Sequence, residues 1–162
     1  WQPAPNLAPP SYGDVAMDPL RGTLWIGDND GVMSLTSWPD AEAVYGHPCG
    51  PGRPWLLAHG SPRLPQADFA LSCSGVAPGA TTLFMVSGGP AALAVSASCT
   101  VYVANPVLVG GVVANGSGIA RLPVPLPWVP ALRGLVVHAQ AFAAPPTGGV
   151  VFTQGLRLLI GE

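Results

Sequence analysis

The chain has 162 residues, of which 49% are hydrophobic and only 9% are charged, and its formal net charge at pH 7 is −2. This length fits one compact domain with a sizeable core. The sequence has no basic patch, which argues against nucleic-acid binding, and no run of about 20 apolar residues that would span a membrane as a helix.

The first predicted segment is an extended arm over residues 1–13, which contains four prolines and few core-forming residues. Proline favours polyproline conformation over helix. Because the chain begins at Trp1 without a methionine, we expect a mature product or an excised fragment whose leader peptide has been removed.

Residues 14–45 are predicted to form a β-meander and a linker. Short apolar strands at 14–18, 23–27 and 32–38 are separated by the turn signals PLRG and DNDG. The segment VAMDPLRGTLWIGDNDGVMSL resembles the sequence of one blade of the propellers found in extracellular repeat proteins. A single meander leaves an apolar face, which the rest of the chain or another copy must cover.

The turn after the second of these strands contains Asp28 and Asp30, followed by Gly31. Alternating oxygen ligands before a glycine match the first part of a calcium loop. No glutamate closes the loop at the twelfth position, so a hairpin turn is the simpler interpretation. We therefore predict no metal site and keep Asp28 and Asp30 as the remaining calcium candidates, with Asp14 and Asp18 as further ligands.

The remainder, residues 46–162, is predicted to be an antiparallel Greek-key β-sandwich of the Ig-like or jelly-roll-like kind. A turn-rich linker over 40–54 marks its start, and strands follow at short, regular intervals, as is typical of sandwiches. They are expected at 55–59, 68–74, 81–87, 92–96, 99–104, 107–114, 118–124, 134–142, 150–153 and 156–160.

Two sequence features predict how these strands connect. The dipeptide Asn115-Gly116 predicts a type I′ hairpin turn, in which both residues take positive φ, although Asn115 also begins a glycosylation sequon. Four prolines between 123 and 130 cannot donate to a strand ladder, so this segment is expected to be an edge or a crossover between sheets.

Several sequence segments from Gly46 onward together form a recognisable pattern. They are Cys49-Gly50, HGSPRLPQADFALSCSGVAPGATTLFMVS, Cys99 heading an apolar strand, LPVPLPWVPALRGLVVHAQAF and the closing QGLRLLIG. This part resembles a small module that terminates many large secreted bacterial proteins. The resemblance implies a Greek-key sandwich, secretion to the extracellular space or cell surface, and a structural or anchoring role. Cys73 departs from the pattern of that module.

The sequence has three cysteines, so at least one lacks an intrachain disulfide partner. We prefer a Cys49–Cys99 disulfide, which would close a loop of about 50 residues and stabilise the fold by about 4 kcal/mol in the chain-entropy model. Cys73 alternates with Phe69 and Leu71 and is expected to face the core. A Cys73–Cys99 bridge between adjacent strands is the alternative, which geometry must decide.

No arrangement of residues predicts catalysis or a cofactor. The three histidines, His47, His59 and His138, are isolated, and no nucleophile elbow or phosphate-binding glycine loop occurs. Glutamate occurs only at Glu42 and Glu162, and the aspartates fall mostly in turns. We therefore predict a protein that is not an enzyme and binds no cofactor.

Aromatic side chains are the better candidates for function, because they supply flat apolar faces for contact with proteins or sugars. We predict Trp1, Tyr12, Trp25 and Trp128 as partner-binding residues, although Trp25, like Trp55, also fits a position in the core.

The scarcity of charge has two competing explanations. No charged residue occurs between Asp68 and Arg121, and lysine is absent from the chain. Monomers rely on surface charge for solubility, so we expect neighbouring molecules to cover much of this surface. A genome that favours alanine, glycine, proline and arginine codons would explain the composition nearly as well.

These observations predict a secreted, non-catalytic structural protein whose copies assemble into a filament, sheath or surface layer through the N-terminal segment. The alternative is a carbohydrate-binding or cell-surface anchoring module of a larger secreted protein. The expected partners are further copies of the chain or a polysaccharide, and not nucleic acid.

Overall fold

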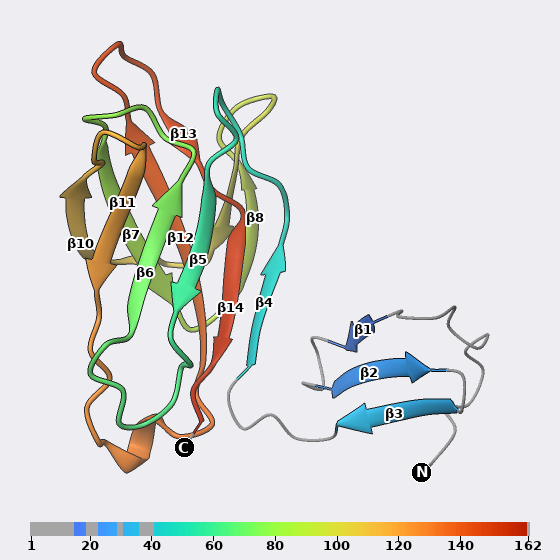
Figure 1. Ribbon diagram of the computed structural model, residues 1–162. Coiled ribbons are helices and arrows are strands. Elements are labelled where there is room, and N and C mark those ends of the chain that lie inside the picture. The colour runs from blue at the N-terminus through green and yellow to red at the C-terminus, as the bar shows by residue number, and fades with distance from the viewer. Residues whose placement is uncertain (1–14, 19–22, 29–30, 36–40, 162) are drawn as a thin grey trace.

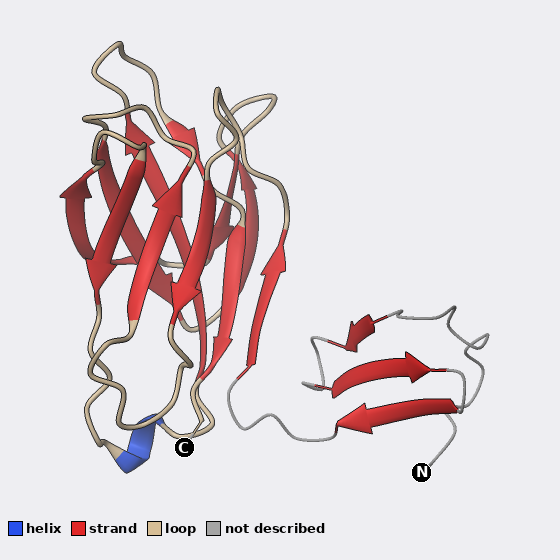
Figure 2. Cartoon of the chain, in the orientation of Figure 1, coloured by secondary structure: helices blue, strands red, loops and turns tan. Residues whose placement is uncertain are grey.

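The computed structural model describes the backbone of residues 15–18, 23–28, 31–35 and 41–161, and the side chains of residues 42–161. Strands dominate the described part, which contains no α-helix and a single short 3-10 helix, η1 (Pro130–Leu132) (Figure 1, Figure 2). No helix among the described residues has the length and apolar character needed to cross a membrane.

The predicted meander is present as a separate antiparallel sheet. It consists of β1 (Val15–Asp18), β2 (Thr23–Asp28) and β3 (Gly31–Leu35) in the order β1-β2-β3. Asp28 is the last residue of β2 and pairs with Gly31 across the turn. Trp1, Tyr12 and Asp30 lie outside the described residues, as do the side chains of Trp25 and Asp28.

The main sheet has six antiparallel strands in the order β10-β7-β12-β14-β4, with β13 also pairing with β12. Its strands are β4 (Ala41–Tyr45), β7 (Thr81–Ser87), β10 (Val107–Val113), β12 (Val136–Ala144), β13 (Val151–Phe152) and β14 (Gly155–Leu159). The linker predicted over residues 40–54 therefore contains a strand, β4, that pairs with β14 and extends the sandwich toward the N-terminus.

A second sheet packs against one face of the main sheet. It contains β11 (Ile119–Pro123), β6 (Ala70–Ser74) and β5 (Trp55–His59) in that order, and it lies in front of β7 and β12 in Figure 1. The predicted antiparallel β-sandwich is therefore confirmed, and its Greek-key connection stays a prediction.

The core lies between these two sheets. The central strand β12 contributes three small, fully buried side chains on its inner face, Ala139, Ala141 and Ala143, with the partly buried Val137 beside them. Larger side chains fill the space in front of them, so that large and small residues interdigitate. The largest fully buried apolar ones in this core are Phe84, Leu56, Leu71 and Leu156.

A third layer is the hairpin formed by β8 (Pro90–Ala94) and β9 (Thr100–Val103), which pair antiparallel in a sheet of their own. Its β9 strand contacts the outer face of the main sheet, opposite the core, because Gln140 points outward from β12 between the inward-facing Ala139 and Ala141.

The connection between β10 and β11 corrects one prediction. Neither Asn115 nor Gly116 has positive φ; instead Gly118 has φ +70°. Asn115 accepts hydrogen bonds at Oδ1 from the backbone N–H groups of Ser117 (2.9 Å) and Ile119 (3.1 Å), while the Gly118 N–H donates to the Asn115 carbonyl (2.9 Å). The loop is therefore a four-residue turn closed by a glycine in the left-handed region, and the asparagine side chain stabilises it.

The proline-rich segment behaves as predicted. Strand β11 ends at Pro123 and is an edge of the second sheet, and the chain then crosses to β12 in the main sheet. Trp55 was expected to lie in the core as well as Trp25, and for Trp55 this is wrong, because its side chain is 44% exposed. Strand alternation places Leu56 inward and Trp55 outward.

Candidate binding site

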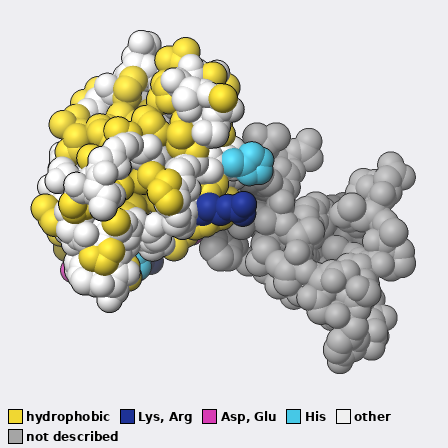
Figure 3. Space-filling model, turned by 90° about the horizontal axis from the view of Figure 1, so that it is seen from above, with side chains coloured by type: hydrophobic (Ala, Val, Ile, Leu, Met, Phe, Trp, Pro, Cys, Tyr) yellow, Lys and Arg dark blue, Asp and Glu magenta, His cyan; other side chains and the backbone are white. Residues whose placement is uncertain are grey.

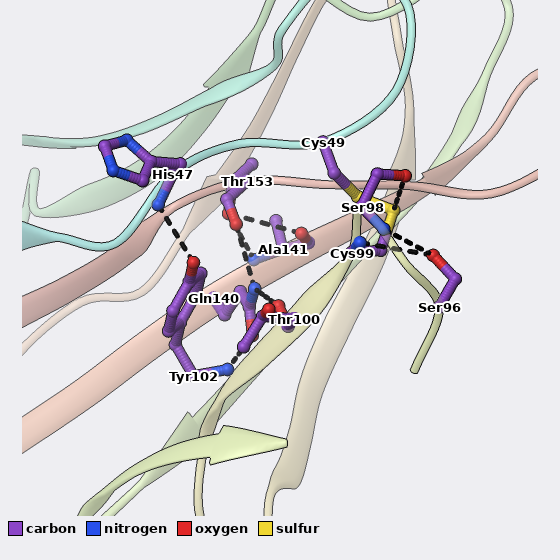
Figure 4. Close-up of a disulfide and its surroundings, with 10 residues drawn as sticks. All are labelled: His47, Cys49, Ser96, Ser98, Cys99, Thr100, Tyr102, Gln140, Ala141 and Thr153. Carbon is purple, nitrogen blue, oxygen red and sulfur yellow. Dashed lines mark hydrogen bonds between the residues drawn. A yellow bond between two sulfur atoms is a disulfide. The ribbon is translucent and has the colours of Figure 1, made fainter. Parts of the chain in front are cut away.

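Gln140 joins the hairpin to the main sheet (Figure 4). Its Oε1 accepts a hydrogen bond from the Tyr102 backbone N–H (2.8 Å), and its Nε2 donates to the carbonyls of Thr100 (3.0 Å) and Thr153 (2.8 Å). The side-chain amide thus takes the place of a neighbouring peptide along β9. A fully buried amide with its hydrogen bonds satisfied fixes the position of the hairpin.

A disulfide fixes the loop between the two hairpin strands. Cys49 and Cys99 are bonded with an S–S distance of 2.03 Å and a Cα–Cα distance of 5.2 Å, which confirms the preferred pairing. Cys49 in turn pairs with Phe152 of β13. Cys73 is buried and free, and burial raises the pKa of its thiol to about 12, so it stays protonated and inert at neutral pH.

The opposite end of the hairpin is fixed by Ser87, the last residue of β7. Its hydroxyl contacts the carbonyls of Gly89 and Ala104 and accepts a hydrogen bond from the Gly89 N–H (3.1 Å). Ala104 N–H also donates to the Gly89 carbonyl (3.0 Å). Both ends of the hairpin are therefore bonded to the rest of the chain.

An aromatic cluster of Tyr45, Tyr102 and His138 lies against β9. The Tyr45 hydroxyl donates to the Tyr102 carbonyl (3.0 Å) and lies 3.1 Å from His138 Nδ1, and both ring pairs that include Tyr45 meet edge to face. A Cβ at Gly155 would overlap the Tyr45 ring, and one at Gly46 would overlap the Tyr102 ring, so both positions require glycine.

Tyr45 and His138 are uncharged at neutral pH. Burial raises the pKa of Tyr45 to about 12. Burial, and secondarily the positive charge of Arg157, lowers the pKa of His138. Since no carboxylate or nucleophile joins the cluster among its hydrogen-bond partners, we interpret it as a packing contact between β4, β12 and the hairpin.

An apolar cavity, the hairpin trough, lies between the hairpin and the outer face of the main sheet, with a volume of about 690 Å³. The main sheet contributes Met85, Phe142, Phe152 and the preceding Val150. The hairpin and the chain after it contribute Ala91, Leu93, Val101, Val103, Ala104, Asn105 and Pro106. Leu93 and Val150 are 63% and 50% exposed, so the trough is open to solvent along part of its length.

The free edge of β10 is the second apolar surface. Among the described strands, β10 pairs only with β7. Its side chains Val107 and Val113 are each 64% exposed and Leu108 is 58% exposed. No charged residue occurs anywhere in this strand. Long, exposed, apolar edges of this kind are templates for pairing with another strand.

The outer face of the second sheet carries polar and aromatic groups. Trp55, Leu57 and His59 alternate outward along β5, and Arg121 lies two strands away, because Leu57 and Arg121 both pair with Ser72 of β6. Small residues of β6 lie between the two rows. Trp128, in the connection from β11 to β12, is 57% exposed, and its contact with a partner stays a prediction.

Charged groups are rare on the described surface, and hydrophobic side chains cover much of the face shown in Figure 3. Within residues 42–161, no group of three histidine, cysteine, aspartate or glutamate side chains is arranged to hold a metal ion. The chemistry available at the trough and at β10 is therefore apolar contact and strand pairing.

Sequence reasoning did not identify the trough. Met85, Phe142 and Phe152 each belong to predicted strands, but the sequence does not show that a hairpin lies over the outer face of those strands. The alternation of β12 contained part of the signal, since its outward positions His138, Gln140 and Phe142 are all bulky. Comparison of the chain with protein-family models, with curated protein sequences and with solved structures finds no match.

Proposed function

We propose that this chain is a non-catalytic, extracellular structural protein whose copies assemble by strand pairing at the free edge of β10. The observation that carries the proposal is the exposed, uncharged edge formed by Val107–Val113. An incoming strand would satisfy the backbone groups of that edge and cover its valines. The sequence predicts that the N-terminal segment or the meander of one copy completes a β-sheet of the next copy.

Two further observations support secretion and assembly. The Cys49–Cys99 disulfide is of a kind that persists in oxidising compartments. The charge-free stretch between Asp68 and Arg121 contains both the hairpin and β10, so the part of the surface with least charge is also the part with an unpaired edge.

Light scattering coupled to size exclusion, with negative-stain imaging, tests the proposal. Val113→Lys places a charge on the β10 edge and should weaken assembly more than about 100-fold, since burying an unpaired charge costs several kcal/mol. Val44→Lys is the matched control, because Val44 is 54% exposed on β4, the opposite edge of the same sheet. A wild-type chain that stays monomeric, or equal assembly by both variants, would contradict the proposal.

The second candidate function is binding of a polysaccharide, favoured by two exposed tryptophans, Trp55 and Trp128. Exposed indole rings stack on sugar faces, and His59 and Arg121 on the same sheet face as Trp55 offer hydrogen-bond donors. Glycan-array binding that is lost in both Trp55→Ala and Trp128→Ala would favour this function. Binding unchanged in both variants would exclude these residues as its site.

A further inference from the structure

The lining of the hairpin trough is almost wholly hydrocarbon. Asn105 is the only polar side chain among its lining residues, and none of them is ionisable. A peptide, sugar or nucleotide would place hydrogen-bonding groups against a surface that cannot pair them, and each such group costs free energy. A ligand for the trough must therefore be apolar where it touches the lining.

The hairpin that forms one wall of the trough is fixed by contacts outside the trough. Gln140 fixes the backbone of β9, the disulfide at Cys99 fixes the loop end, and Ser87 fixes the other end. These contacts fix the position of the hairpin over Met85 and Phe142. The volume, about 690 Å³, lies within the range of small-molecule sites, which are largely formed before the ligand arrives.

We propose that the hairpin trough binds the aliphatic chain of an amphiphile, such as the acyl chain of a fatty acid or lipid. The hydrocarbon lies between the hairpin and Phe142 and Phe152, and the polar end of the ligand remains in water at the exposed mouth beside Leu93 and Val150. Met85 and the branched side chains adapt their rotamers to a flexible chain. This binding does not depend on self-assembly through β10.

Fluorescence titration of the full chain with N-phenyl-1-naphthylamine, followed by displacement with saturated fatty acids, tests the proposal. We expect saturable binding at one site. Each added methylene should increase fatty-acid affinity about fourfold until the trough is filled, which corresponds to about 0.8 kcal/mol per buried methylene. Flotation with phosphatidylcholine vesicles then shows whether the protein takes the acyl chain of a lipid in a bilayer or that of a free fatty acid in solution.

Two neighbouring alanines on β8 supply a matched pair of variants. Ala91 lines the trough and Ala92 is exposed outside it. Ala91→Trp should fill much of the cavity and lower probe affinity at least about tenfold, because the indole ring would occupy volume that the ligand needs. Ala92→Trp should leave affinity unchanged. Leu93→Gln, at the exposed mouth, is a second test variant that should weaken binding without disturbing the core.

Three outcomes would overturn the proposal. They are the absence of saturable probe binding, an equal response of Ala91→Trp and Ala92→Trp, and binding that disappears as the chain self-associates. The last result would mean that a second copy occupies the trough.

Discussion

The two lateral sides of the sandwich differ in how their strand edges are satisfied. On one side lies β5, where the Leu56 N–H donates to Gln154 Oε1 (3.1 Å) and the Leu56 carbonyl accepts from Gln154 Nε2 (2.7 Å). The next outward-directed N–H of that strand, at Ala58, donates to the Glu42 carboxylate. On the other side lies β10, whose outer edge pairs with no described strand.

This difference shows that a strand edge can be closed by side chains as well as by another strand. Gln154, and likewise Gln140 beneath the hairpin, presents a carbonyl and an amide that mimic one peptide of a neighbouring strand. The edge of β5 is therefore closed within a single chain, whereas β4, the main-sheet strand on the same side, pairs only with β14 among the described strands. The edge of β10 has no such side-chain partner in the described residues and is lined by exposed valines, which is the state expected of an edge that accepts a partner.

The strongest test of the closed side is Gln154→Leu. This change would leave the Leu56 N–H and carbonyl buried without partners, which should destabilise the fold by about 2 to 4 kcal/mol. Urea unfolding followed by tryptophan fluorescence measures the change. Gln66→Leu is the control, because Gln66 is only half-buried, and it should shift stability by less than about 0.5 kcal/mol. Equal effects of the two changes would show that Gln154 does not close the edge.

The sequence allowed the sandwich to be predicted because its strands are short, regularly spaced and bounded by glycine and proline. It also supported the Cys49–Cys99 pair, since Cys73 alternates with core residues. It could not identify Gln140 and Gln154 as edge partners, because each bonds to a strand 38 or more residues away. Such contacts depend on how the layers pack, so no local sequence pattern predicts them.

The errors at β4 and Trp55 have local causes. Residues 41–45 lie directly before a run of glycine and proline, and this turn-rich composition obscured the strand. In the segment WLLAH, alternation that directs Leu56 inward must direct Trp55 outward, so strict use of the strand period would have placed it on the surface. Size and apolar character alone are poor guides at such positions.

A smaller change in the free energy of unfolding is expected at β7, the strand that pairs with β10. Thr82 on β7 is fully buried, and its Oγ1 has no hydrogen-bond partner among the described residues. Thr82→Val keeps the shape and removes the unsatisfied hydroxyl, so it should raise the free energy of unfolding by about 1 kcal/mol. Thr153→Val is the opposite control, because the Thr153 hydroxyl bonds to both backbone groups of Ala141. That change should destabilise the fold by about 1 to 3 kcal/mol. A loss of stability in Thr82→Val would indicate a partner for its hydroxyl.

The smallest change in stability is expected at Glu42, whose carboxylate closes the β5 edge at Ala58. Partial burial raises the pKa of Glu42, against the smaller lowering influences of His59 and the Ala58 N–H. At pH values between the unfolded and the folded pKa, the folded chain therefore keeps a proton on Glu42 that the unfolded chain has released. Stability falls as pH rises from the unfolded pKa, about 4.3, through the higher folded value.

Glu42→Gln removes this pH dependence and keeps an oxygen that can accept from the Ala58 N–H. Below about pH 4 the variant and the wild type should be equally stable, because both side chains are then uncharged. At neutral pH the variant should be more stable, by no more than about 0.5 kcal/mol, since solvent screens a partly exposed carboxylate. Urea unfolding at both pH values measures the difference. A less stable variant at neutral pH would mean that the attraction to His59 outweighs the cost of burial, and that this edge is closed by an ion pair.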